Sequence, residues 1–424
     1  MVDGASTSLS SDFWRFWLGQ TVSKLGDSIS WFALPLLVFK LTGSALNLGL
    51  TTAASFVPYL LFGLFIGAYV DRVQRKRMMV LTDVGRMLVM ASIPVLALMN
   101  DLHVWWIYAV AFITSTQAIF FDSGEFAAIP SLVSQDDLVT ANGRIQASYS
   151  AAQVVGPLLG GALLAVIAVY NLIWLDAASF ALSAISIGLV SASFNPEQPD
   201  EAKKPTTILH DVKEGLTYVL RHPVLRNISL MMAMVNFFAA TTYTELVLFA
   251  KDRLAATDTQ VGILFAAGSA GIVVTGLLAG RLRKKWSFSR VALGALLLSG
   301  LFILFFSMVR EIWLAVPLWG AAGGLGILFN INTGSLRQAI VPNRLLGRVM
   351  SIASVLAWSA IPVGALLGGY LIEKTGRPAL VYAGIGIITA IIPMVFSFTP
   401  LGHAEDYLPK DEPTPEAELE AATY

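Results

Sequence analysis

The chain has 424 residues, of which 56% are hydrophobic and only 13% are charged. Soluble proteins hold roughly 45–50% apolar and about 25% charged residues, so this composition excludes a soluble globular protein. The formal net charge is zero, which gives no indication of a nucleic-acid partner. The chain has no cysteine, which excludes disulfides, thiolate metal sites and cysteine catalysis.

Apolar segments of bilayer-spanning length recur about twelve times along the chain, each closed by charged residues, proline or glycine. A helix needs about 20 apolar residues to cross the hydrocarbon core. The segments are continuous and lack the alternation of barrel strands, so they predict an all-α membrane protein with twelve transmembrane helices. We place the helices near residues 16–39, 46–70, 78–99, 104–124, 145–169, 172–192, 227–250, 259–280, 289–309, 312–333, 349–372 and 378–398.

Two motifs repeat at nearly the same distance, which indicates a duplicated bundle. The segment 67–77 returns in degraded form as 276–285, a shift of 209 residues. The segment 156–161 returns as 364–369, a shift of 208 residues. Two independent motifs therefore agree on one repeat length and predict two six-helix pseudo-repeats.

The repeats and the composition divide the chain into four predicted parts. We expect an N-terminal six-helix bundle over residues 1–193 and a C-terminal six-helix bundle over residues 227–400. Residues 194–226 are predicted as a cytoplasmic linker loop with an amphipathic helix over 208–221. The acidic tail over 401–424 is predicted to be disordered.

The distribution of basic residues predicts the orientation. The first residues lack the basic start and cleavage site of a secretory signal, so we expect the first apolar segment to be retained as a helix. Most of the 28 Lys and Arg residues fall on the side of the predicted membrane that holds both termini. Because basic residues concentrate in cytoplasmic loops, both termini are predicted to be cytoplasmic in a multi-pass protein of the inner or plasma membrane.

The loop after the second apolar segment carries a recognisable pattern of one glycine, one acid and several bases. The pattern is Gly67-x-x-x-Asp71-Arg72-x-x-Arg75-Lys76. In a chain with twelve predicted spans it resembles the signature loop of the major facilitator superfamily, although Gln74 stands in the place of that family's usual glycine. The resemblance extends over nearly the whole chain. It implies a substrate cavity between two six-helix halves.

Further motifs resemble the branch of this superfamily that contains drug, macrolide and enterobactin exporters. They are Ser23-x-Leu25-Gly26-Asp27, Ala33-Leu34-Pro35-Leu36 and Leu41-Thr42-Gly43-Ser44. The fifth segment carries Gly156-Pro157-x-x-Gly160-Gly161, which resembles the antiporter motif of drug and proton exchangers, with Ala152 where that motif often begins with glycine. The resemblance implies proton-coupled export, or antiport, of amphipathic small molecules. We expect a monomer that needs no cofactor.

Asp27 is the first candidate for coupling to protons. It lies in the middle of the first apolar segment, where insertion scales assign a charged residue about 2.5–3.5 kcal/mol. It shares one helical stripe with Gln20, Lys24 and Trp31. Desolvation favours a protonated carboxyl group, so we predict that Asp27 exchanges its proton for substrate. Lys24 and Gln20 are predicted to take part in this coupling. The alternative is a structural pair of Lys24 with Asp27.

Glu245 in the seventh segment is the second coupling candidate.

Aromatic and amide side chains in the first, fourth and seventh segments are predicted to line the substrate cavity. Aromatic rings there would receive a hydrophobic or cationic ligand. The alternative is ordinary packing against lipid or neighbouring helices, which we favour for Asn236. The predicted cavity residues are Trp31, Gln117, Phe120, Phe121, Asn236 and Tyr243.

The signature loop is predicted to act as a conformational latch rather than to bind substrate, because its charges lie at helix ends. The predicted latch comprises Gly67, Asp71, Arg72, Arg75, Lys76, Asp122 and Glu125. Asp83 and Arg86, one turn apart in the third segment, are interpreted as a structural pair. In the fifth helix, Gly156, Pro157, Gly160 and Gly161 either seal one opening of the cavity or provide ordinary small-residue packing.

The sequence carries no nucleotide-binding loop, zinc-protease motif or nucleophile elbow, so we expect neither an enzyme nor a metal site. The predicted function is proton-coupled export of amphipathic small molecules or drugs by alternating access. The alternatives are a dedicated siderophore or macrolide exporter, a lipid translocator and, in a different class, a non-transporting scaffold or sensor. The cost of placing Asp27 and Glu245 in a membrane argues against the last of these.

Overall fold

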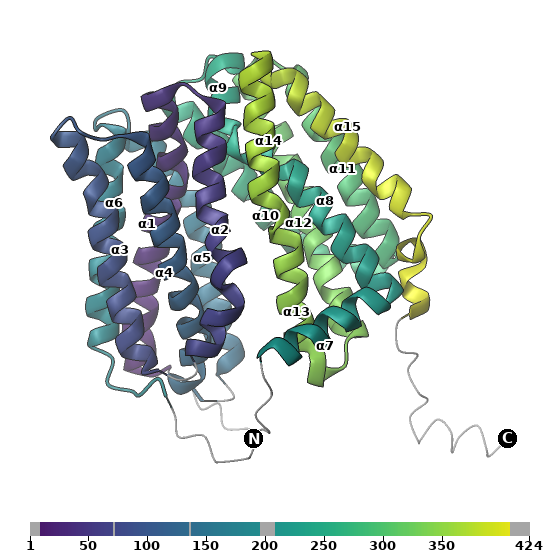
Figure 1. The fold of residues 1–424 in the computed structure, drawn as a ribbon, viewed down its shortest axis with the longest axis horizontal. Helices are drawn as coiled ribbons and strands as arrows, with labels where there is room; N and C mark the ends of the chain where they lie inside the picture. Colours follow the sequence, from purple (N-terminus) through teal and green to yellow (C-terminus); the bar gives the residue numbers. More distant parts are fainter. Residues whose placement is uncertain (1–8, 71–72, 135–136, 196–207, 408–424) are drawn as a thin grey trace, which may run out of the picture.

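The computed structural model describes residues 9–70, 73–134, 137–195 and 208–407. All regular secondary structure among these residues is helical, which confirms the predicted all-α class (Figure 1). The first helix group comprises α1 (Ser11–Thr42), α2 (Ala45–Val70), α3 (Arg75–Leu98), α4 (Val104–Ala128), α5 (Leu138–Leu163) and α6 (Val169–Gly188). The second helix group comprises α8 (Pro223–Thr244), α9 (Leu246–Leu254), α10 (Asp258–Lys285), α11 (Phe288–Met308), α12 (Ile312–Ile340), α13 (Asn343–Trp358), α14 (Ala360–Thr375) and α15 (Pro378–Phe396).

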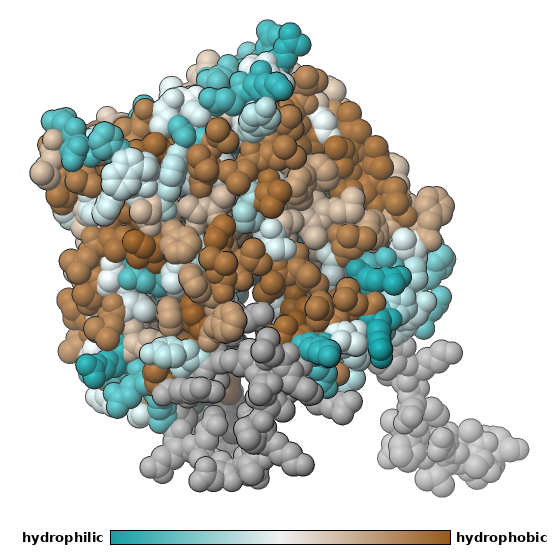
Figure 2. All heavy atoms as spheres, viewed as in Figure 1, coloured by the Kyte–Doolittle hydropathy of each residue, from teal (hydrophilic) through white to brown (hydrophobic). Residues whose placement is uncertain are grey.

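Eleven helices among the described residues are long and apolar enough to cross a membrane. Of the twelve predicted spans, α5 is the one that does not meet this criterion. It carries Arg144, Gln146 and Gln153, which make it less apolar, yet it packs between α1 and α10 inside the bundle. Figure 2 shows hydrophobic side chains gathered over the middle of the visible face, with hydrophilic ones at its upper and lower ends. Large apolar side chains such as Leu88 and Leu182 are more than half exposed, as expected for surfaces in contact with lipid.

The two helix groups meet through α5 and α10. An added Cβ atom at Gly262 in α10 would lie 2.6 Å from the carbonyl oxygen of Pro157 and 3.0 Å from the Cα atom of Gly161. Only glycine permits such close backbone approach. The hydroxyl of Thr259 also donates a hydrogen bond to the carbonyl of Gly161, at 2.9 Å. The antiporter-like motif of the fifth helix therefore joins the first group to the second.

A second contact between the groups, of α14 with α2, repeats the same arrangement. Gly364 in α14 faces the backbone of Phe237 in α8, and Gly369 faces the carbonyl of Ala45 in α2, with an added Cβ 2.7 Å from that oxygen. In the first group, Gly156 of α5 faces Ser28 of α1. Ser28 and Phe237 are 209 residues apart, so the repeat in the sequence is also a repeat in helix packing.

Of three predicted segments, the structure confirms one and differs from two. The span predicted over 349–372 is two helices, α13 and α14, which meet at Ser359. The predicted amphipathic helix over 208–221 is confirmed as α7 (Ile208–Arg221), which packs on α8 and α13. The start of the predicted disordered tail forms short helical turns over Pro400–Tyr407, and residues 408–424 lie outside the described residues. The predicted division of the chain into four parts stays a prediction.

Replacing Gly262 with Ala is expected to destabilise the protein by about 1–3 kcal/mol, because the added methyl group forces α5 and α10 apart. Gly276→Ala is the matched control on the same helix, since no heavy atom lies within 4 Å of its added Cβ. Alanine is roughly 1 kcal/mol more favourable than glycine inside a helix, so this control is expected to be neutral or stabilising. Apparent melting temperatures of the purified variants in detergent test both expectations. Equal melting temperatures would contradict the close contact.

Candidate functional site

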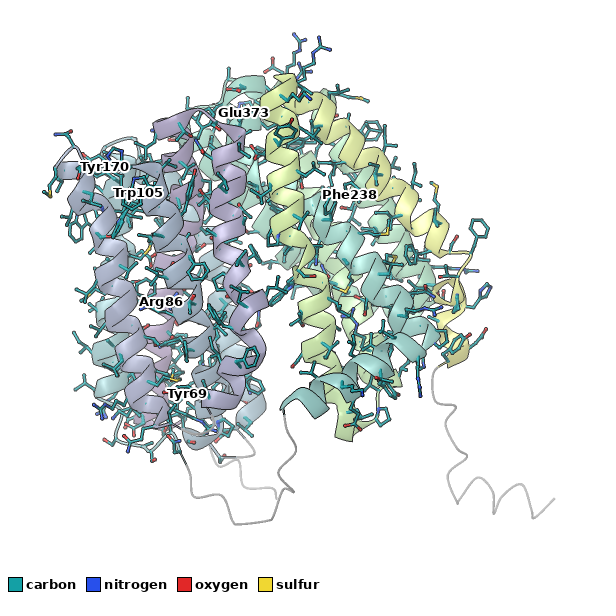
Figure 3. The ribbon with its side chains drawn as sticks, viewed as in Figure 1. Tyr69, Arg86, Trp105, Tyr170, Phe238 and Glu373 are labelled. Atoms are coloured by element: carbon teal, nitrogen blue, oxygen red, sulfur yellow. The ribbon has the colours of Figure 1, made fainter. Side chains whose placement is uncertain are left out.

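An ion pair between α1 and α3 is the centre of the site. The guanidinium of Arg86 donates a hydrogen bond from Nη2 to Oδ1 of Asp27, at 2.9 Å. The ammonium of Lys24 lies 3.8 Å from the other oxygen of Asp27. Figure 3 places Arg86 inside the first helix group, at about half its height. The side chain of Asp27 is 28% exposed whereas that of Arg86 is 7% exposed, so Asp27 is the accessible member of the pair.

The surroundings of Arg86 hold its guanidinium in place. Its carbon Cζ lies 4.0 Å from the ring centroid of Phe180 in α6, a distance typical of cation–π attraction. The fully buried Asp83 lies 3.8 Å from Nη1. The predicted structural pair of Asp83 and Arg86 therefore lies in contact, but Arg86 has its shorter bond to Asp27 on another helix. A buried cation of this kind needs an anionic partner.

Two carboxylates of α4 extend the site toward α5. Asp122 lies 3.4 Å from the ammonium of Lys24, and Glu125 accepts a hydrogen bond from the hydroxyl of Tyr149. The ammonium of Lys24 lies 5.0 Å from the ring centroid of Tyr149. These residues form what we call the charge cluster, with four acids and two bases: Lys24, Asp27, Asp83, Arg86, Asp122 and Glu125.

Asp176 in α6 is a further acid that the sequence interpretation did not single out. It is 1% exposed, and it lies close enough to Asp27 and Arg86 for their charges to interact. Oδ1 of Asp176 lies 2.8 Å from the position of an added Cβ at Gly26 in α1. The signal in the sequence was a lone acid within the apolar segment 172–192, the same kind of signal that marked Asp27.

A cavity of about 220 Å³ lies between the two helix groups. Its walls come from α1, α2, α8, α10 and α14, and they include Trp31, which follows Asp27 by four residues on α1. Of the predicted cavity residues, Asn236 and Tyr243 also line it. Asn236 additionally donates a hydrogen bond to the carbonyl of Ala357 at 3.0 Å, as the packing alternative expected. The walls are mostly apolar and aromatic, which suits an amphipathic ligand.

The remaining predicted cavity residues do not line this cavity, and neither does Gln20, which shares a stripe of α1 with Asp27. Gln117 and Phe120 line a separate groove beside the end of α2. Phe121 is 1% exposed and packs in the core of the first helix group. Gln20 is buried and donates a hydrogen bond to the hydroxyl of Ser183 in α6, at 3.0 Å. Each of these side chains lies away from the cavity described above.

Glu245 stands apart from the charge cluster, at the junction of α8 and α9. It is fully buried, and neither of its carboxyl oxygens has a hydrogen-bond partner among the described residues. Its oxygen Oε1 lies 3.2 Å from the position of an added Cβ at Gly369 in α14. A buried charge needs a partner to offset its desolvation cost, and Glu245 has none among the described residues. It directly follows Thr244, which lines the cavity.

The predicted latch is divided between two places. Arg75 donates its backbone N–H to Asn195 at 2.9 Å and a guanidinium N–H to the carbonyl of Phe194 at 3.1 Å. Lys76 bonds the carbonyl of Val190, so both bases bind the chain that follows α6. Asp122 and Glu125 belong to the charge cluster. Gly67 lies near the end of α2, whereas Asp71 and Arg72 lie outside the described residues.

Polar contacts join the two helix groups near the end of α1 and the start of α10. Lys40 of α1 pairs with Asp258 of α10, which also binds Lys251 at 2.5 Å. Ser44 donates a hydrogen bond to Glu373 of α14 at 3.0 Å, and Figure 3 shows Glu373 at the top, where the helix groups meet. The sequence interpretation missed these residues, since each lies in a short loop or at a helix end where charges are common.

The pair of Arg86 and Asp27 is expected to show strong energetic coupling. Arg86→Leu leaves Asp27 and Asp83 without their cation and is expected to cost about 3–5 kcal/mol. Adding Asp27→Asn to that variant is expected to recover part of the loss, with a coupling energy of about 0.5–3 kcal/mol. The measurement is a double-mutant cycle of unfolding free energies.

The control cycle combines Asp27→Asn with Arg15→Leu, because Arg15 binds Asp12 at 3.0 Å and not Asp27. These two changes are expected to be additive. If the cycle of Arg86 with Asp27 were equally additive, the ion pair would not contribute to stability.

Comparison with known proteins gives consistent matches along the chain. A family model described as transmembrane secretion effector (MFS_3) matches residues 5–423. The multidrug efflux pump Tap of Mycolicibacterium fortuitum is 27% identical over 390 residues, which cover 88% of this chain and 92% of that protein. Macrolide efflux protein A of Streptococcus pyogenes is 23% identical over 368 residues, which cover 86% of this chain and 90% of that protein.

Solved structures show the same fold. A bacterial homologue of the human lysosomal transporter Spinster, inward-facing and unoccupied, aligns with a TM-score of 0.71 at 15% identity, over 95% of this chain and 98% of that one. The nucleoside transporter NupG aligns with a TM-score of 0.73 at 12% identity, over 91% of this chain and 99% of that one. These likenesses extend over both helix groups.

Proposed function

Because the chain belongs to the transmembrane secretion effector family of the major facilitator superfamily, we propose that it is a proton-coupled exporter of amphipathic small molecules, including drugs. The family match confirms the predicted fold and the prediction of a membrane transporter rather than an enzyme. The proposal goes further in naming the coupling ion, the direction and the substrate class. We also propose that both termini are cytoplasmic, so that the end closed by Lys40 and Asp258 faces outward.

The observation that carries the proposal is the position of Asp27. Its carboxylate is partly exposed, bound by Arg86 at 2.9 Å, and one helical turn from Trp31 in the wall of the cavity. A proton that binds Asp27 removes a negative charge from the charge cluster and breaks the pair with Arg86. A cationic or neutral substrate is then held less firmly. Proton uptake from outside thus favours release outward, and proton loss inside favours rebinding.

The proton gradient supplies sufficient free energy for this cycle. One proton that moves down about 150 mV releases roughly 3.5 kcal/mol, at about 2.3 kcal/mol per 100 mV. That free energy supports a substrate concentration ratio of about 300-fold. One proton per molecule is therefore sufficient for a neutral substrate, whereas a one-for-one exchange of a proton with a monovalent cation moves no net charge and is driven only by the pH difference.

The charge cluster favours cationic over anionic substrates. It contains four acids and two bases, so an anion would meet an excess of negative charge. Lys24, the base that would meet an anionic siderophore or lipid headgroup, is already within 3.8 Å of Asp27 and 3.4 Å of Asp122. The names of the relatives, a multidrug pump and a macrolide efflux protein, agree with a drug-like substrate. A dedicated siderophore exporter or a lipid translocator is the weaker reading.

Asp27→Asn is expected to abolish substrate-triggered proton flux, because the amide cannot bind and release a proton. The measurement is lumenal pH in proteoliposomes under an imposed proton gradient, while lipophilic cations, macrolides and a siderophore are added. We expect wild-type protein to respond to at least one lipophilic cation, with a rate at least about ten-fold above that of the variant. Asp101→Asn is the control, since Asp101 lies in an exposed loop and is 68% exposed.

Proton flux that persists in Asp27→Asn but is lost in Glu245→Gln would move the coupling site to Glu245. If no compound moves protons in wild-type vesicles that pass a folding check, proton exchange with drugs is wrong. A siderophore or lipid response without a cation response would favour the weaker reading. Unchanged cellular function in both variants would favour a scaffold or sensor.

A further inference from the structure

A second groove, larger than the cavity, lies between the two helix groups. It has a volume of about 560 Å³, and its walls come from α2, α4 and α13. Phe56 lines both the groove and the cavity, so the two spaces are neighbours along α2. The groove lies farther along α2 than the cavity does, toward the end of that helix that leads to Arg75 and Lys76.

A pair of aromatic rings joins the helix groups at this groove. Tyr59 of α2 and Trp358 of α13 meet edge to face, with ring centroids 5.5 Å apart. Phe56 continues the row, with its ring centroid 6.2 Å from that of Tyr59. Trp358 is the last residue of α13, directly before the break at Ser359. A bend at this break would move Trp358 relative to Tyr59 without unfolding either helix.

The charge cluster and one wall of the groove share a helix. Ile119 of α4 lines the groove, and Asp122 of the charge cluster follows it by three residues on the same helix. With more acids than bases, the charge cluster attracts cations. The groove itself offers aromatic rings, the thioether of Met350 and the hydroxyl of Ser354. Aromatic faces attract organic cations, so both the walls and the nearby charge suit one kind of ligand.

We propose that this groove is a first binding site for an amphipathic organic cation with a bulky aromatic body, and that Tyr59 and Trp358 separate it from the cavity. The inference rests on the proposed function, since it names the route and substrate class for that transport. The groove of about 560 Å³ accommodates a larger ligand than the cavity of about 220 Å³. A bulky cation therefore occupies the groove first, and the aromatic pair must part before it passes Phe56.

The absence of cysteine from the chain permits a direct test of occupancy. Ser354→Cys places one thiol in the wall of the groove, and its reaction with a maleimide is followed in proteoliposomes without a proton gradient. Saturating tetraphenylphosphonium is expected to slow this reaction at least about five-fold. Tetraphenylborate, of similar shape and opposite charge, is expected to give little protection. Ser191→Cys, an exposed thiol beyond α6, is the control and is expected to react at the same rate with or without the cation.

Tetraphenylphosphonium could protect the thiol either by direct contact with the aromatic pair or by closing the groove. Trp358→Ala in the Ser354→Cys background distinguishes these two causes. This change is expected to abolish most of the protection, whereas Trp313→Ala, a 63% exposed tryptophan at the start of α12, is expected to leave it intact. Protection that survives Trp358→Ala would overturn the proposal, as would an unchanged reaction rate in the parent variant. If tetraphenylphosphonium still drives proton flux in that case, only the groove is wrong. If it drives none, the proposed function fails for this cation as well.

Discussion

Arg86 is a guanidinium held inside a group of transmembrane helices, and a cation in that position must keep an anion in contact. The ring of Phe180 at 4.0 Å and the buried Asp83 fix the guanidinium from one side. Asp27 completes the arrangement from α1 and remains 28% exposed. The cation is thus the more buried partner, and the acid is the partner that solvent can reach. On our proposal, a proton therefore enters the pair without a rearrangement of the helix that carries Arg86.

The second repeat keeps the helix packing but not the charges. The residues 209 positions after Asp27, Asp83 and Arg86 are Asn236, Ala292 and Ala295. Glycines of α5 and α14 nevertheless make equivalent contacts with α1 and α8. The first helix group therefore carries the charge cluster, whereas the second keeps the buried acid Glu245 and supplies Asn236 and mostly apolar walls to the cavity.

The spans and the repeat were predictable because they depend on local properties, namely the length of apolar segments and the spacing of glycine motifs. The partner of Asp27 was not, because Lys24 is its neighbour on the same stripe while Arg86 is 59 residues away. The same limit applies to Tyr59 and Trp358, which meet only after the two helix groups pack. A sequence gives the cost of an intramembrane acid, but the contact that offsets this cost is a property of the folded bundle.

The two ends of the bundle are held together by different forces. At the start of α10, Lys40 and Asp258 are 41% and 23% exposed, and ion pairs that contact water contribute little net stability. At the other end, Tyr59 and Trp358 meet through aromatic surfaces. Between them, the close backbone contact of Gly161 with Gly262 leaves no room for sliding. The contacts between the helix groups therefore differ in kind: exposed ion pairs at the start of α10, a close glycine contact one turn further along α10, and an aromatic pair between α2 and α13.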